Sequence, residues 1–303
     1  MSPLDSRPTP EEFNIPVVGR IYLNGEMVDP REARVSVFDR GFVFGDGIYE
    51  VIPAFGGRAF RVSQHLDRLA ASLAAVDLAD PLTRVEWTGA FDRLLAQEHG
   101  VDQYIYLQVT RGVAPRDHSY PVNARPTVVA YAQRLVSVPD SVLEDGVDAV
   151  TADDIRWSRC DIKTVSLLAN VVLRQCANER GAVEAILLRD GHVTEGAASN
   201  IFIVNEGVLL TPPKGRHILP GITRDLVLEL AARHGLPHAE AQITDAALRG
   251  ADEVWMTSST KEIVPIRRVD GLRVGGGKAR PVFARMLELY RRYKEDCRAG
   301  RAG

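Results

Sequence analysis

The sequence is poor in cysteine and has no long apolar run, and each shortage excludes a class of protein. Its 303 residues include three cysteines, an odd number without the spacing of metal ligands. A disulfide framework and a metal centre are therefore not expected, and a reducing cytoplasm is favoured. No stretch approaches the ~18 apolar residues of a membrane span, and the polar, proline-rich N-terminus lacks the apolar core of a signal peptide. We expect a cytoplasmic protein with an N-terminal extension over residues 1–18.

The chain also lacks an excess of charge of one sign, and it has little lysine. Its net charge of -3 gives no electrostatic reason to expect a nucleic acid or an anionic membrane as a partner. Only five of the 37 basic residues are lysines, which a coding preference for arginine would also explain. Because arginine keeps its proton at working pH, chemistry that needs a free amine has few candidates. They are Lys163, Lys214, Lys261, Lys278 and Lys294.

What the chain does have is a set of hairpins kept apart from its helices. Asn24-Gly25, Gly56-Gly57 and Asp190-Gly191 are two-residue turn signals between segments typical of strands. Helical spacing of apolar residues recurs in SLLANVVLRQCANERG, GITRDLVLELAARHG and RPVFARMLELYRRYKEDCRAG. This segregation predicts an α+β fold of two domains, with mainly antiparallel sheets flanked by helices. We expect a smaller domain over 19–134, a linker over 135–146 and a larger domain over 147–303.

Lys163 is the lysine whose position most favours chemistry. It ends the run DIRWSRCDIK and lies just before a predicted helix, where a loop could direct its amine into a crevice. Taken alone, a lysine is more typical of an exposed, solubilising charge. Its importance therefore depends on whether the rest of the sequence supplies other groups for the same site.

Two segments carry the backbone and hydroxyl groups that bind a phosphate. Gly221-Ile222-Thr223 opens a helix with a glycine and a hydroxyl, and helix N-termini bind anions. Ser258-Ser259-Thr260 adds hydroxyls after an apolar strand, and Arg68 in HLDRL could add a cation. Each feature is also typical of an ordinary cap, turn or exposed arginine.

Two further groups suit an aromatic cofactor and a carboxylate substrate. The pyridine nitrogen of pyridoxal phosphate (PLP) must be protonated to act as an electron sink, and a facing carboxylate ensures this. Glu195 in VTEGAASN precedes small residues that would leave room for a flat ring. Arg116 and His118 in PRDH present donors that suit a substrate carboxylate. A solvent-exposed glutamate and a polar surface loop remain the alternatives.

Seven runs together resemble the fold-type IV PLP-dependent aminotransferases, and among them the D-amino-acid transaminases. The resemblance extends from about Arg20 to the C-terminal helix, and the runs occur in the order found in the family. They are DRGFVFGDGIYEV, HLDRL, YIYLQVTRGVAPRDHSYP, DIRWSRCDIK, EAILLRDGHVTEGAASN, HILPGITRD and MTSSTKEI.

The resemblance implies ping-pong transamination of D-amino acids with a 2-oxo acid, for example D-alanine with 2-oxoglutarate. Lys163 would form the aldimine with PLP and would shuttle the proton, and Glu195 would pair with the ring nitrogen. Tyr49, Arg116 and His118 would bind the substrate carboxylate, with the loop of the last two supplied by the neighbouring subunit of a homodimer. The cofactor-binding set implied is Arg68, Lys163, Glu195, Ser199, Leu219, Ile222, Thr223, Ser258 and Ser259.

Several activities share much of this pattern. Branched-chain L-amino-acid and (R)-amine transaminases and aminodeoxychorismate lyases have the same fold, although they resemble the PRDH loop less well. A catalytically idle PLP-binding protein is the non-enzymatic alternative, which the presence of Lys163 and Glu195 disfavours. The sequence departs from the family at Ala197-Ala198, where serines are usual, and at Lys261, where a small polar residue is usual.

Overall fold

The computed structural model describes residues 17–123, 125–277 and 279–301, which form two compact units. The first unit takes the described residues up to Val136, the segment Lys163–Ser166 and the residues from Cys297 on. The second takes Ser137–Ile162 and Leu167–Asp296. Most of the predicted extension over 1–18 lies outside the described residues, and its last two positions begin the first strand.

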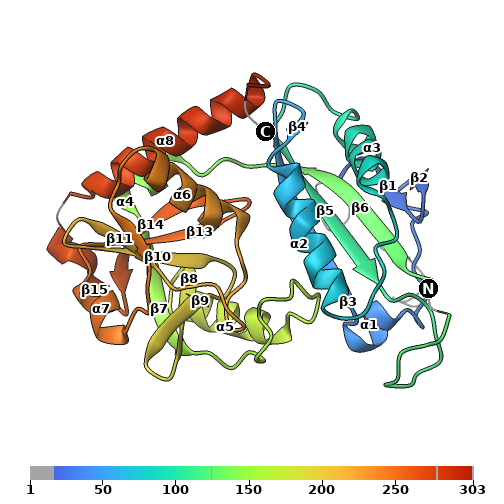
Figure 1. The fold of residues 1–303 in the computed structure, drawn as a ribbon, viewed down its shortest axis with the longest axis horizontal. Coiled ribbons are helices and arrows are strands. Elements are labelled where there is room, and N and C mark those ends of the chain that lie inside the picture. Colours follow the sequence, from blue (N-terminus) through green and yellow to red (C-terminus); the bar gives the residue numbers. More distant parts are fainter. Residues whose placement is uncertain (1–16, 124, 278, 302–303) are drawn as a thin grey trace, which may run out of the picture. The chain divides into compact units, whose positions relative to one another are not determined.

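The first unit is built on a six-stranded sheet in which all neighbouring strands are antiparallel. The order is β2-β1-β6-β5-β3-β4 (Figure 1). Asn24-Gly25 and Gly56-Gly57 make the two predicted turns, and all four residues have positive φ, as such hairpin turns require. The strands are β1 (Val17–Leu23), β2 (Glu26–Val28), β3 (Gly47–Phe55), β4 (Arg58–Ala59), β5 (Gln103–Thr110) and β6 (Thr127–Arg134).

Side chains alternate across this sheet, so one face is buried and the other carries polar and aromatic groups. Helices α2 (Val62–Ala74) and α3 (Arg84–Leu95) pack against the strands and cover the buried face. Ile48, Glu50 and Ile52 of β3 are almost wholly buried, whereas Tyr49 and Val51 are only partly buried. Thr83 and Glu86 form a capping box at the start of α3. The short helix α1 (Arg40–Phe44) precedes β3.

The second unit contains a mixed sheet of nine strands. Along it the order is β12-β11-β10-β13-β14-β7-β8-β9, with β15 paired to β14. The pairs β11–β12, β14–β7 and β7–β8 are parallel, and the others are antiparallel. The strands are β7 (Val147–Asp153), β8 (Glu184–Arg189), β9 (His192–Gly196), β10 (Asn200–Asn205), β11 (Val208–Thr211), β12 (His238–Glu240), β13 (Glu253–Ser258), β14 (Glu262–Val269) and β15 (Leu272–Arg273).

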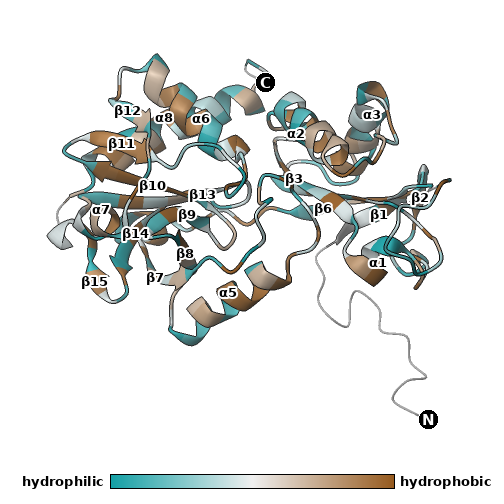
Figure 2. Ribbon diagram, turned by 60° about the horizontal axis from the view of Figure 1, so that its bottom comes forward, coloured by the Kyte–Doolittle hydropathy of each residue, from teal (hydrophilic) through white to brown (hydrophobic). Residues whose placement is uncertain are grey.

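Apolar side chains on both faces bury the second sheet between helices, and its strands are therefore apolar at successive positions. On β13, Val254 and Met256 belong to a core cluster that includes Leu248 of α7, whereas Trp255 packs edge-on against Phe283 of α8. The apolar strands are brown in Figure 2. The helices are α4 (Asp140–Asp145), α5 (Leu168–Glu179), α6 (Ile222–Arg233), α7 (Asp245–Gly250) and α8 (Pro281–Arg298), with a 3-10 turn η1 (Val274–Gly277).

The fold has the predicted α+β class, with helices flanking mainly antiparallel sheets. The unit boundaries differ in detail from the predicted domains. Helix α4 lies inside the predicted linker 135–146, and Lys163–Ser166 groups with the first unit rather than with the larger domain. In the part of the chain that the structure describes, no helix is both long and apolar enough to cross a membrane.

Candidate active site

Lys163 is held at the free edge of β3 in the first unit. The Tyr49 N–H donates to the Lys163 carbonyl at 3.0 Å, and the Val165 N–H donates to the Gly47 carbonyl at 3.0 Å. The Lys163 N–H donates to Ser72 Oγ on α2 at 3.2 Å. Residues 163–165 thus use backbone groups that the sheet edge would otherwise leave unpaired. This pairing fixes the backbone from which the Lys163 amine projects.

The Lys163 amine lies against the ring of Tyr49, with Nζ 4.1 Å from the ring centroid. Tyr49 stacks on Tyr106, with centroids 5.9 Å apart, and Tyr106 stacks on Tyr131 at 5.1 Å. Burial raises the pKa of Tyr106, so that its hydroxyl stays protonated. Among the described residues, Lys163 makes no ion pair, which leaves its amine available for chemistry.

Arg116 and His118 lie together on the exposed loop between β5 and β6. The Phe44 ring contacts both, 5.3 Å from the His118 ring and 5.4 Å from the Arg116 guanidinium carbon. Arg40 anchors the loop by donating to the Asp117 carbonyl at 2.6 Å. Within the described part of this unit, no hydrogen bond, ion pair or ring contact joins the pair to Lys163. The fold brings Lys163 to Tyr49 but does not bring Arg116 and His118 to them.

Arg68, predicted to bind phosphate, is anchored by a carboxylate that sequence reasoning did not single out. Its Nε and Nη2 donate to the two oxygens of Glu50, each at 2.8 Å. His65 Nδ1 lies 2.8 Å from Glu50 Oε2, and all three side chains are buried. Glu50 follows Tyr49 in β3 and therefore faces α2. A buried, charged residue in an otherwise apolar strand was the available signal.

Glu195 of β9 is buried in the second unit and accepts three hydrogen bonds. The Leu219 N–H donates to its Oε2 at 3.0 Å, and Asn200 Nδ2 donates to the same oxygen at 3.1 Å. Arg156 Nη1 pairs with Oε1. Burial raises the pKa of Glu195 to about 7, against the lowering effect of Arg156. Leu219 and Glu195, two members of the cofactor-binding set that the resemblance implies, thus lie together, and Asn200 and Arg156 join them.

The N-terminus of α6 is close to this carboxylate and has no side-chain cap. Asn200 connects Glu195 to the start of α6. Its Nδ2, which donates to Glu195, also donates to the Leu219 carbonyl at 3.0 Å, and its Oδ1 lies against Gly221. Thr223, in the first turn, donates to the Ser258 carbonyl at 3.2 Å. The sequence-predicted residues Ile222, Thr223 and Ser258 therefore come from two elements that meet at one place, and Ser259 follows directly.

Ser199 and Lys261 belong to a second polar group beside this region. Ser199 Oγ donates to Glu184 Oε2 at 2.8 Å, so its proton is committed to a buried carboxylate. Glu184 also lies 3.8 Å from Arg174. Burial and the charge of Arg174 lower the pKa of Lys261. The hydroxyl of Ser199 thus supports the fold here.

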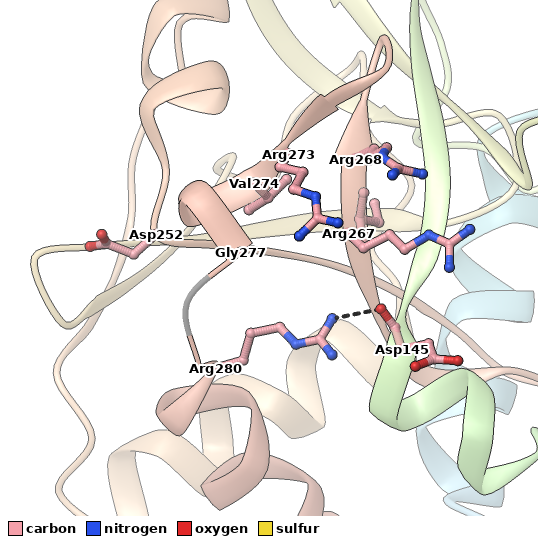
Figure 3. A pocket seen from close by; sticks show the side chains of 9 residues that line it. Asp145, Asp252, Arg267, Arg268, Arg273, Val274, Gly277 and Arg280 are labelled. Atoms are coloured by element: carbon pink, nitrogen blue, oxygen red, sulfur yellow. Dashed lines mark hydrogen bonds between the residues drawn. The ribbon is translucent and has the colours of Figure 1, made fainter.

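A hollow of about 290 Å³ lies elsewhere in the second unit and contains none of the predicted site residues (Figure 3). Four arginines line it, but two of them already face Asp148, Arg267 at 2.7 Å and Arg268 at 3.7 Å. Arg280 donates to backbone carbonyls of α4. Figure 3 shows the charged lining residues Asp145, Asp252, Arg267, Arg268, Arg273 and Arg280.

Comparison with known proteins decides the family. The model of the amino-transferase class IV family matches residues 47–269. The chain belongs to the class IV aminotransferases. D-alanine aminotransferase from Staphylococcus haemolyticus is 40% identical over 278 residues, which cover 91% of this chain and 98% of that protein. Two branched-chain aminotransferase structures match as well. That of Escherichia coli has a TM-score of 0.85 at 28% identity, covering 94% of this chain and 96% of its own.

The second similar structure is that of the T.th. branched-chain aminotransferase with pyridoxamine 5′-phosphate, which has a TM-score of 0.83 at 26% identity. It covers 94% of this chain and 95% of its own. The aminotransferase described here is therefore a PLP-dependent enzyme of fold type IV.

The residues of this aminotransferase fit PLP. A carboxylate has about four acceptor positions, and the described donors to Glu195 occupy three of these, which leaves one for a ring N–H. The uncapped start of α6 suits a phosphate, and the Lys163 amine is unpaired among the described residues. The sequence patterns indicated these groups but not Glu50, Arg156 and Asn200. Their contacts with Arg68, Glu195 and the Leu219 carbonyl span 18, 39 and 19 residues of the chain.

Proposed function

We propose that this aminotransferase exchanges the amino group of D-amino acids with 2-oxo acids in a ping-pong reaction, with Lys163 as the catalytic residue. D-alanine and 2-oxoglutarate, giving pyruvate and D-glutamate, are the representative pair. The full-length similarity to D-alanine aminotransferases carries this proposal, at 40% identity over 91% of the chain. The PRDH loop with Arg116 and His118 supports it, because its donors suit a substrate carboxylate.

The residues of the second unit would hold the cofactor at its two ends. Bound PLP supplies an electron sink that stabilises negative charge at the substrate's α-carbon. Glu195 would hold a proton on the ring nitrogen, and Leu219 would pack against the ring. Ile222, Thr223, Ser258 and Ser259 would bind the phosphate through backbone N–H groups and hydroxyls. Arg68, which belongs to the first unit, would add a cation. Ser199 would contribute its backbone, since its hydroxyl donates to Glu184.

Lys163 would hold the cofactor through its amine and then move the proton of the reaction. Its backbone is fixed on both sides by Tyr49 and Ser72, so the amine returns to one position after release. As general base, Nζ would take the proton from the α-carbon of the substrate and deliver it on the cofactor side. The Tyr49 ring beneath Nζ limits where the amine can move.

Substrate binding would use Arg116 and His118 from a second copy of the chain in a homodimer. Both side chains are exposed and make no contact with Lys163 in their own unit. The same loop carries exposed apolar side chains, Val113 at 56% and Val122 at 96%, and exposed apolar groups favour an interaction surface. The homodimer, and with it a cytoplasmic location, is part of this proposal.

A half-reaction screen tests the activity. The PLP-loaded protein is mixed with single D-amino acids, L-amino acids or (R)-amines, and the visible absorbance of the bound cofactor is followed. We expect D-alanine and D-glutamate to abolish this absorbance at least about tenfold faster than their L-forms. A preference for L-leucine and L-valine would favour the branched-chain activity, to which the E. coli structure is similar. A preference for (R)-amines, or pyruvate release from aminodeoxychorismate, would also contradict the proposal.

The role of Lys163 has its own control. Lys163→Ala should lose the visible absorbance and all turnover, because no other amine replaces it. Lys214→Ala is the matched variant, since Lys214 pairs with Asp225 and lies partly exposed. It should remain yellow and active. An active Lys163→Ala protein would refute the assignment.

A further inference from the structure

Arg156 lies directly beside Glu195, and no sequence pattern assigned it a role. Its Nη1 and Glu195 Oε1 form a buried ion pair, with 9% of Arg156 and 4% of Glu195 exposed. Both residues belong to the second unit. Because a guanidinium does not lose its proton in proteins, this pair sets a permanent positive charge against the carboxylate.

Asp154 fixes the orientation of this guanidinium. Arg156 Nε and Nη2 donate to Asp154 Oδ1 and Oδ2, both at 2.9 Å, in the bidentate geometry that aligns the two planar groups. Nη2 also donates to the His217 carbonyl at 3.2 Å. Asp154 is itself held by Thr194 Oγ1 at 2.9 Å. The remaining Nη1 is thereby directed at Glu195.

Glu195 needs a cationic partner because its carboxyl group is buried. Burial favours the neutral form of a carboxyl group and raises the pKa of Glu195 to about 7, although the charge and hydrogen bond of Arg156 lower it. The other charges nearby partly cancel: Asp154 raises the pKa of Glu195, and Arg189 contacts Asp154 at 3.4 Å. The neighbouring thiol of Cys160 stays neutral, since burial raises its pKa to about 11. Arg156 is thus the main group favouring the ionised form.

A neutral Glu195 would keep its own proton. It would then face the ring nitrogen of PLP as a hydrogen-bond donor, and the nitrogen would lose the positive charge that makes the ring an electron sink. We propose that Arg156 is a positioning residue that keeps Glu195 ionised, so that the proton between Glu195 and the ring nitrogen stays on the nitrogen. This inference rests on the proposed function, because the proton can be shared between Glu195 and a ring nitrogen only when PLP is bound.

The test measures the proton directly. Wild type, Arg156→Gln and Arg156→Lys are loaded with PLP that carries ¹⁵N in the ring, and the ¹⁵N chemical shift reports protonation of that nitrogen. Wild type and Arg156→Lys should show the protonated shift, and Arg156→Gln should move towards the unprotonated one. A cation beside a carboxyl moves its pKa by about one to three, and each unit is about tenfold. The kcat of Arg156→Gln should therefore fall at least about tenfold, with KM little changed.

Arg159→Gln is the matched control. Arg159 lies on the same loop and pairs with Asp161, but both side chains are about one third exposed, at 34% and 33%. Its ¹⁵N shift and kcat should equal those of wild type. Equal ¹⁵N shifts in Arg156→Gln and wild type would overturn the inference, even if the variant melts at a lower temperature, because that result fits a structural role alone.

Two further outcomes are informative. If Arg156→Gln does not fold, the double variant Asp154→Asn/Arg156→Gln replaces it, because it also removes the Asp154 charge that Arg156→Gln leaves without its bidentate partner. It should move the ¹⁵N shift in the same direction by a smaller amount, since Arg156 acts on Glu195 more strongly than Asp154 does, and an unchanged shift would overturn the inference. Failure of wild type to take up PLP would overturn the proposed function and this inference together. Normal turnover of D-amino acids with an unchanged ¹⁵N shift in the variants would overturn the inference alone.

Discussion

At the scale of single residues, buried charges in this protein occur with partners that fix their ionisation. Glu50 is fully buried, and burial alone would raise its pKa. The charge and hydrogen bonds of Arg68, together with His65, outweigh burial and hold the pKa of Glu50 far below its ordinary value of 4.5. Burial lowers the pKa of His65, so His65 is neutral, and its Nδ1 carries the proton that Glu50 accepts. Arg68 therefore depends on Glu50 for its orientation.

Glu50→Gln should destabilise the protein by roughly 3–5 kcal/mol at pH 7, because it leaves the buried Arg68 without a counter-charge. Since the folded-state pKa of Glu50 is depressed, its contribution is complete above pH 4.5 and is lost as pH falls through the folded value. The gap between the urea-unfolding free energies of wild type and variant should therefore shrink below about pH 4.5. Glu98→Gln, which breaks the exposed pair with Arg134, is the control and should change little. A gap that grows on acidification would contradict this account.

At the scale of elements, the sequence predicted the turns and helices, because their formation depends on residues that are close together in the chain. The turns at Asn24-Gly25 and Asp190-Gly191 have positive φ at both positions, and α5, α6 and α8 fall within the predicted segments. Turn dipeptides and the 3.6-residue spacing of apolar side chains act over a few residues, so they predict these elements without knowledge of the rest of the fold. The start of α2 is different: the helix begins at Val62 after Arg61, which has a positive φ, and no side chain caps it.

Pairings between distant segments could not be predicted in this way. Nothing near Lys163 indicates that it pairs with the edge of β3, more than a hundred residues earlier. The same holds for Arg156, which meets Glu195 across a separation of 39 residues. Family resemblance supplied candidate roles for Lys163 and Glu195, whereas their supporting partners became visible only in the folded chain. Long-range contacts of this kind depend on the whole fold rather than on local pattern.

The start of α6 gives a prediction at this scale. A Cβ on Gly221 would overlap Asn200 Oδ1, so Gly221→Ala must displace the side chain that holds Glu195 and the Leu219 carbonyl. We expect a loss of about 1–3 kcal/mol in stability and a dissociation constant for PLP raised at least about tenfold. Gly215→Ala is the control, because a Cβ there meets nothing within 4 Å. Tight PLP binding by Gly221→Ala, measured by fluorescence titration, would show that the close approach is not needed.

At the scale of the whole molecule, the substrate site as proposed would need a second copy of the chain. Arg116 and His118 contact Phe44 of α1 in their own unit yet remain exposed, and Val113 and Val122 on the same loop are exposed as well. Phe42, on that same helix, is 79% exposed. Exposed apolar side chains on and near the loop that carries the proposed substrate-binding pair favour an interface over a free surface.

Hybrid dimers test this dependence. One chain carries Lys163→Ala and the other Arg116→Ala, and two affinity tags isolate the hybrid from both parents. If the loop acts on the neighbouring site, one site receives both lesions and the other receives none, so the hybrid should recover about half of the wild-type kcat with a normal KM. If the loop acts within its own chain, one site lacks the lysine and the other the arginine. The hybrid would then show no site with a normal KM for D-alanine, and the contribution of Arg116 from the partner would be refuted.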